Sequence, residues 1–368
     1  MTPFFPRTAR RAMLLAAAAI VGGCDIVDFA TNPMPQFVQH WNIPAAGTSV
    51  SVASLLPNGV DIYSTPASTP PDSSAFDVDI DTMDFSRRLG LDCPACQALN
   101  GTTAIKDSFN LVSSSSEPLP ADMVSGAVIG GAVRVAVHNT LSFDPIRVRA
   151  ANPQGFLLIV VRSGSLVLGR DSTNGASRAW APGDSIVRTI NLSTGQVVGS
   201  ITVDVTIVSP PGDAPVPINA NGTIRTVAIT ERLLTASIRM NVVAKSLSSA
   251  NDDSLALDGL EEGITRRIIG GALDMRVTNP FAVTGNIEII FGYGPGQSVV
   301  KVLPLPTGVN QPAIAVLDEA EIQQILGRKV RLSIGGVVNS ATPIDVTPRL
   351  AIAFSNRMAL TIRTGGGN

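Results

Sequence analysis

The segment Ile129-Gly130-Gly131-Ala132-Val133-Arg134-Val135-Ala136-Val137-His138-Asn139 recurs 140 residues later as Ile269-Gly270-Gly271-Ala272-Leu273-Asp274-Met275-Arg276-Val277-Thr278-Asn279. Six of these eleven positions are identical. In both copies apolar residues alternate with polar or small ones, a period of two that is typical of an antiparallel strand with one buried face. The segment therefore predicts a tandem duplication of one β-domain.

The two copies continue to correspond beyond this strand. Strands are predicted at residues 200–208 in the first copy and 329–338 in the second. Each is preceded by a predicted helical turn, over residues 192–199 and 317–327. In the second turn Asp318 and Glu321 have the spacing of a capping box, and Gly327 provides a stop signal. Residues 258–268 are a further helical candidate.

The composition favours many short strands. Of the 368 residues 45% are apolar and 15% charged, which excludes a disordered chain. The core must be aliphatic because the chain has only 12 Phe, 2 Tyr and 2 Trp, while 33 Gly and 26 Pro provide turns. The fold class that we expect is all-β: tandem antiparallel β-sandwich domains with minor short helices.

The expected organisation has four parts. Residues 1–23 read as a signal peptide, residues 24–120 as an N-terminal β-rich module or linker, residues 121–250 as the first β-sandwich repeat and residues 251–368 as the second. Within the N-terminal part, Ser- and Pro-rich composition marks linker-like stretches at 64–71 and 113–120, with strand candidates at 49–55 and 76–80.

The N-terminus carries an export signal. Three arginines precede an apolar run over residues 12–21, which is too short to span a bilayer. The run ends in Val21-Gly22-Gly23-Cys24, which resembles a bacterial lipobox. That resemblance implies cleavage before Cys24, a lipid on its thiol and a location in the bacterial cell envelope, at the inner or outer membrane. An ordinary signal peptide is the alternative, and Arg10-Arg11 also resembles a twin-arginine signal.

The other two cysteines form the pattern Cys93-Pro94-Ala95-Cys96. Because exported proteins meet oxidising conditions, a local disulfide is the favoured interpretation. A haem site would need a histidine where Gln97 stands, a thioredoxin-type motif would need a βαβ context, and a zinc site would need two further ligands.

The stretch Thr278-Asn279-Pro280-Phe281-Ala282-Val283 resembles the late-embryogenesis-abundant type 2, or water-stress/hypersensitive-response (WHy), domains. The first copy departs from that pattern, since Thr140 stands where the second copy has a proline. The resemblance implies a non-enzymatic β-sandwich of about a hundred residues per copy, and it transfers no functional residue.

Few residues are candidates for chemistry. The chain has two histidines, His40 and His138, and no nucleophile elbow, zinc-protease motif or phosphate loop, so we expect no catalytic residue and no cofactor. Alternation would place Asp77, Asp79 and Asp81 on one face of a strand, where they could bind calcium or simply be solvated.

These observations predict a membrane-anchored lipoprotein of the cell envelope that acts as a non-catalytic structural or interaction module. The expected partners are the membrane, through the N-terminal lipid, and other envelope proteins. A net charge of −2, with 27 basic and 29 acidic residues, excludes the basic surface of a nucleic-acid-binding protein. The alternative is a carrier that holds a lipophilic ligand in a cavity of the β-sandwich.

Overall fold

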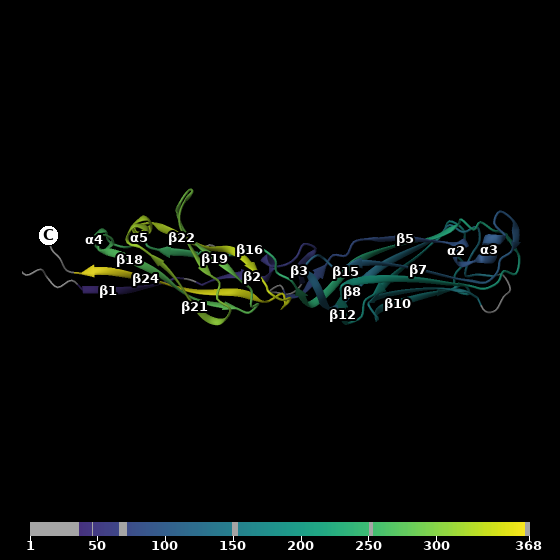
Figure 1. The fold of residues 1–368 in the computed structure, drawn as a ribbon, viewed down its shortest axis with the longest axis horizontal. Coiled ribbons are helices and arrows are strands. Elements are labelled where there is room, and N and C mark those ends of the chain that lie inside the picture. The colour runs from purple at the N-terminus through teal and green to yellow at the C-terminus, as the bar shows by residue number, and fades with distance from the viewer. Residues whose placement is uncertain (1–36, 46, 66–71, 149–153, 250–252, 365–368) are drawn as a thin grey trace, which may run out of the picture.

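The computed structural model describes residues 37–45, 47–65, 72–148, 154–249 and 253–364. Two β-lobes lie end to end and make an elongated rod (Figure 1). We call residues 60–148 and 154–240 the distal lobe, and residues 37–55 and 242–364 the proximal lobe. Antiparallel strands dominate both lobes and helices are few and short, which confirms the predicted fold class.

The distal lobe is a sandwich of two sheets that β12 joins, because it pairs with β8 of one sheet and with β13 of the other. One sheet has the order β11-β8-β15-β5 and the other the order β7-β13-β9-β10. The elements of this lobe are β3 (Val60–Thr65), β4 (Asp72–Val78), β5 (Met83–Arg88), α2 (Leu89–Asp92), α3 (Pro94–Ala98), β6 (Thr103–Ile105), β7 (Phe109–Pro118), β8 (Met123–Asn139), β9 (Phe156–Ser163), β10 (Leu166–Asn174), β11 (Ser185–Asn191), β12 (Gly195–Val198), β13 (Ser200–Ser209), β14 (Pro215–Pro217) and β15 (Thr223–Met240).

The proximal lobe repeats this arrangement. One sheet has the order β21-β18-β24, with β1 and β2 both on the far side of β24, and the other has the order β20-β19-β22, with β16 and β17 on β22. Its elements are β1 (Phe37–Pro44), β2 (Thr48–Ser51), the 3-10 turn η1 (Val52–Ser54), β16 (Lys245–Ser248), β17 (Asp253–Ala256), α4 (Glu262–Thr265), β18 (Ile268–Asn279), β19 (Thr284–Gly294), β20 (Gln297–Pro304), β21 (Gly308–Leu317), α5 (Glu319–Ile325), β22 (Lys329–Asn339), β23 (Ile344–Val346) and β24 (Ala351–Thr364).

The core of each lobe is aliphatic and follows the alternation of the strands. Along β8 the side chains of Val133, Val135 and Val137 are fully buried, while Arg134 between them is exposed. Along β18 the side chains of Leu273, Met275 and Val277 repeat the pattern. Inward residues from the facing sheets complete the packing, so the period of two places the hydrophobic side chains between the sheets.

Glycine is required where the repeated strand β8 bends. Gly131 has a φ of 139°, which disfavours other residues, and a Cβ at this position would lie 2.2 Å from the carbonyl oxygen of Arg232. The pairing of β8 with β15 shifts register beside it, between Thr230 and Arg232. The glycine thus lets the two long strands stay paired through a bulge.

The separate module predicted over residues 24–120 does not exist as one unit in the described residues. β1 and β2 pair with β24 of the proximal lobe, whereas β4, β5 and β7 pair with strands of the distal lobe. The N-terminal strands therefore occupy, in the proximal lobe, the place that β5 occupies in the distal lobe. The distal lobe is inserted between β2 and the rest of the proximal lobe.

Two local predictions were also wrong. Most of the predicted linker at 113–120 belongs to β7, which pairs with β13 from Phe109 to Pro118. Every second residue of β7 is buried or half-buried, so this serine-rich stretch has the alternation of a strand. The predicted helical turn at 192–199 contains the strand β12 instead. By contrast, α5 begins with the expected capping box of Asp318 and Glu321, and Gly327 follows it with a φ of +69°.

Both described ends of the chain lie at the tip of the proximal lobe, where Phe37 pairs with Thr364 (Figure 1). The opposite tip holds α2 and α3. Across the described part of the chain, no helix combines the length and the apolar character needed to cross a membrane.

Candidate functional site: a lysine pocket at the distal tip

The predicted site residues lie in different places. Cys24, the predicted lipidation site, falls outside the described residues. Cys93 and Cys96 form a disulfide at the distal tip, where both are buried and Cys93 precedes the short helix α3. The backbone N–H of Cys96 donates to the sulfur of Cys93 at 3.1 Å. A structural disulfide was the favoured interpretation of this motif, and the structure supports it.

The predicted row of three carboxylates is interrupted, because β4 ends at Val78 and only Asp77 lies within it. The charge of Asp79 is still close enough to contribute to the pKa of Asp77. The carboxylate of Asp77 lies 3.4 Å from the guanidinium of Arg232, and burial raises its pKa, with smaller effects of nearby charges. The described residues contain no group of three acidic, histidine or cysteine side chains that could hold a metal ion.

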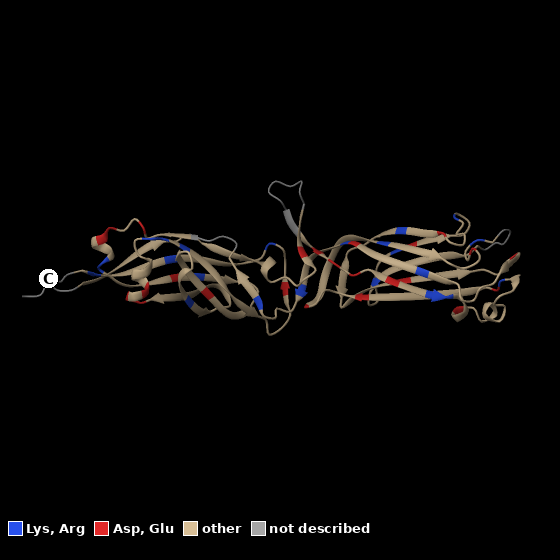
Figure 2. Cartoon of the chain, turned by 90° about the horizontal axis from the view of Figure 1, so that it is seen from above, with Lys and Arg blue, Asp and Glu red and all other residues tan. Residues whose placement is uncertain are grey.

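The two histidines lie on the sheet surfaces, each beside a hydroxyl group. His138 lies 3.0 Å from the hydroxyl of Ser185, and His40 lies 3.5 Å from the hydroxyl of Thr361. Acidic and basic residues are interspersed along the ribbon of both lobes (Figure 2).

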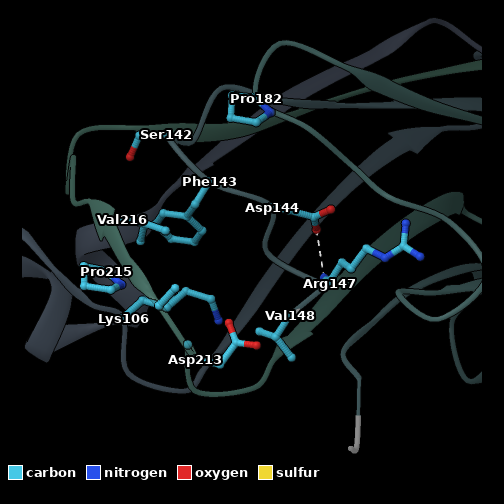
Figure 3. Close-up of a pocket in the computed structure, with 12 residues that line it drawn as sticks. Lys106, Ser142, Phe143, Asp144, Arg147, Val148, Pro182, Asp213, Pro215 and Val216 are labelled. Carbon is cyan, nitrogen blue, oxygen red and sulfur yellow. Dashed lines mark hydrogen bonds between the residues drawn. The ribbon is translucent and has the colours of Figure 1, made fainter. Parts of the chain in front are cut away.

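A pocket of about 330 Å³ opens at the distal tip (Figure 3). Two loops form most of its wall, one after β8 and one between β13 and β14. Its side chains combine apolar surface with charges of both signs, and they include Lys106, Phe143, Asp144, Arg147, Asp213 and Val216. No element of the predicted repeat signalled this pocket, because its residues come from loops that differ between the two copies.

Lys106 is the one lysine that is almost fully buried, with 3% of its surface exposed. Its ammonium group donates to the hydroxyl of Ser209 at 2.8 Å and to the carbonyl of Pro210. The rings of Phe109 and Phe143 lie 5.7 and 5.8 Å from the same nitrogen, within cation–π range. Burial lowers the pKa of Lys106 to about 8, although the neighbouring carboxylates, chiefly Asp144, oppose the change.

Asp144 fixes the conformation of the loop that follows β8. One of its carboxylate oxygens accepts the backbone N–H groups of Ile146 and Arg147, both at 2.9 Å, and the second accepts that of Trp180 at 2.6 Å. Trp180 is itself fully buried, and its indole N–H donates to the carbonyl of Asp184 at 3.1 Å. The loop therefore has a defined conformation before any ligand arrives.

A second, larger pocket of about 640 Å³ lies beside the first, and residues such as Phe109, Ser209 and Pro210 that surround Lys106 also line this pocket. Neither lining contains a histidine or a cysteine, so neither pocket has a nucleophile paired with a histidine base. The arrangement is suited to binding: rigid walls, apolar surface and a few hydrogen-bonding groups.

Comparison with known proteins adds little to this picture. No family model and no curated protein matches the chain. Among solved structures, a candidate secreted protein from Parabacteroides distasonis aligns over 89% of this chain and all of its own length, with 9% identity and a TM-score of 0.30. The CBM22 tandem of Xyn10C from Paenibacillus barcinonensis aligns over 88% of this chain and all of its own length, with 9% identity and a TM-score of 0.17. These similarities are too low to assign a family or a function.

Proposed function

We propose that this protein is a lipid-anchored, non-catalytic rod of the bacterial cell envelope that presents its distal tip to a protein partner. The observation that carries the proposal is the position of the chain ends. Phe37 and Thr364 pair at the proximal tip, and the lysine pocket lies at the opposite tip. A chain attached to a membrane shortly before Phe37 would direct the pocket away from that membrane.

The distances agree with this arrangement. Cys24 precedes Phe37 by 13 residues, which reach at most about 45 Å when fully extended. β8 and β24 lie in successive lobes and have 17 and 14 residues, or about 55 and 45 Å at the rise of a strand. A membrane that holds a lipid on Cys24 therefore lies within reach of the proximal tip. The distal tip, two lobes away, is beyond that reach.

The tip has the properties of a recognition surface. Its loops are held by the hydrogen bonds of Asp144 and Lys106 and by the disulfide, so little ordering entropy would be lost on binding. A pocket of about 330 Å³ accommodates a side chain or a short loop of a partner better than an extended peptide. The carrier has less support, since three pockets in the described residues, lined among others by Lys106, Phe109 and Leu158, open at the surface, and aliphatic side chains pack the space between the sheets.

The anchor is tested by the intact mass of the protein purified from its native membranes. We expect the mass of the chain from Cys24, increased by a diacylglycerol and an acyl group. The mass of a chain that begins elsewhere and carries no lipid would contradict the proposal.

The role of the tip is tested by site-specific photocrosslinking in native membranes. A photoreactive residue at Val216, in the pocket wall, should capture one discrete partner, and the same residue at Val187, on the outer face of β11, should not. Capture that is equal at the two positions, or absent at Val216, would argue against recognition through the tip.

A further inference from the structure

The strand β1, at the proximal tip, is unusual for an exposed sheet edge. It pairs with β24 on one side, and no described strand pairs with its other side. Its sequence, FVQHWNIP, contains no lysine, arginine, aspartate or glutamate. Soluble proteins usually protect such edges with charged side chains, and β1 has no such protection.

Two large aromatic side chains and a valine are exposed on this edge. Phe37 is 60% exposed, Val38 57% and Trp41 40%. Phe37 and Trp41 are four residues apart and therefore lie on the same face of the strand. Of the aromatic side chains that the structure describes, three are strongly exposed, and two of those three belong to β1. The chain is poor in aromatic residues, so this placement distinguishes β1 from the rest of the surface.

The short distance in sequence between β1 and Cys24 indicates what covers this edge. β1 is the first described element after Cys24, and the 13-residue separation keeps it within reach of a membrane that holds a lipid on Cys24. We propose that β1 is a membrane-contact edge, and that Phe37, Val38 and Trp41 enter the headgroup layer of the bilayer. This inference rests on the proposed anchoring at Cys24.

The chemistry of the headgroup layer suits the strand. Tryptophan is enriched at membrane interfaces, where its ring lies against apolar groups and its N–H meets polar ones. The N–H and C=O groups of a free strand edge would be costly in hydrocarbon, but water and phosphate oxygens satisfy them in the hydrated interface. Phe37 and Val38 begin β1 at the proximal tip, so this contact adds to the anchor there and leaves the distal tip free of the membrane.

The contact does not depend on anionic lipid. The neighbouring turn carries Glu262 and Arg266, which form an ion pair. Next to it, the backbone N–H of Arg363 donates to the backbone carbonyl of Arg267 at 2.9 Å. The tip therefore carries charges of both signs. We expect zwitterionic phosphatidylcholine to support the contact.

The experiment supplies the anchor chemically. Cys24 is the only cysteine outside the disulfide, so the chain from Cys24 can be coupled through its thiol to a maleimide lipid in phosphatidylcholine vesicles. The vesicles are made with or without brominated acyl chains, which quench tryptophan on contact. We expect a loss of tryptophan emission in brominated vesicles, and no loss for Trp41→Phe, which retains only the buried Trp180.

Matched variants separate the edge from general adsorption. Phe37→Ser combined with Val38→Ser should reduce the quenching of Trp41, whereas Phe156→Ser, an exposed aromatic residue of the distal lobe, should not. No quenching of the coupled protein, or equal quenching of Trp41→Phe, would overturn the proposal. Protection of β1 from hydrogen exchange that rises with protein concentration in the absence of lipid would also overturn it, and would indicate a second copy on this edge. Because the coupling is chemical, these outcomes are independent of whether the native protein carries a lipid.

Discussion

Asn139 and Asn279 share two side-chain hydrogen bonds in the two lobes. Each residue ends the repeated strand, β8 or β18, and each side chain is buried. The amide nitrogen donates to the backbone carbonyl four residues later, at 3.1 Å in the distal lobe and 2.8 Å in the proximal lobe. The side-chain oxygen accepts the backbone N–H two residues later, at 2.9 and 3.3 Å. The asparagine shared by the two copies therefore closes the same turn in each lobe.

Replacement of either asparagine should destabilise the lobe that contains it. Asn139→Ala and Asn279→Ala each leave buried backbone groups without a partner, so we expect a loss of about 2–4 kcal/mol in the free energy of unfolding of that lobe. Asn110→Ala, on the exposed face of β7, is the control and should change it by less than about 0.5 kcal/mol. Denaturant unfolding, monitored by hydrogen exchange in each lobe, measures the free energy of unfolding of that lobe. A loss confined to the other lobe would contradict the assignment.

The N-terminal strands should be part of the proximal lobe. Val50 of β2 is fully buried and pairs with Ile352 of β24, so Val50→Asp would bury an unpaired carboxylate and cost more than about 3 kcal/mol. Ser49→Asp, on the adjacent exposed position, is the matched control. We expect Val50→Asp to remove hydrogen-exchange protection from β24 and leave β13 protected. Unchanged protection of β24 would mean that residues 48–51 are not part of this lobe.

The buried lysine should make stability depend on pH in the alkaline range. The pKa of Lys106 is about 8 in the folded state, whereas an unperturbed lysine has a pKa of 10.5. Between these values the unfolded chain binds the proton that the folded chain has released, so folding becomes more favourable as pH rises. Relative to Lys106→Met, the wild type should gain on the order of 1–2 kcal/mol between pH 8 and 10.5, less than the full shift implies because water reaches the pocket. A difference between the two proteins that stays constant with pH would contradict burial of the ammonium group.

The disulfide should stabilise the distal tip modestly. It closes a loop of only four residues, for which chain entropy predicts about 2 kcal/mol. Both cysteines are buried, so Cys93→Ala with Cys96→Ala is a better replacement than serine, whose hydroxyls would lack partners. Thermal unfolding should show a lower melting temperature for the distal lobe only. An unchanged melting temperature would show that the bond is absent or without effect in the native protein.

The regular part of the fold could be predicted from the sequence. The period of two along residues 129–139 and 269–279 identifies the central strands because one face of each is buried. The Asp318–Glu321 spacing identifies α5 because a capping box is local. The partner of β1 could not be predicted, since β24 lies more than 300 residues away and an edge strand carries no signal of its neighbour.

The candidate site was harder to predict. Lys106 lies in a loop beside Asp107, where the sequence suggests a solvated charge. Only the fold brings it under Phe109 and Phe143 and against the carbonyl of Pro210. The carboxylate row at Asp77 failed for a similar reason, because the alternation that was expected to continue stops where β4 ends at Val78.

We propose that the membrane holds the proximal tip and that the lysine pocket points away from it. Energy transfer from a donor dye to a labelled lipid in native-like vesicles measures how far each tip lies from the membrane. One donor is placed at Arg147 beside the pocket and another at Thr364 beside β1, each through an unnatural amino acid in the lipid-anchored protein. We expect strong transfer from position 364 and little from position 147, since the two positions lie at opposite tips of the rod. Equal transfer from both positions, or stronger transfer from position 147, would contradict the proposal.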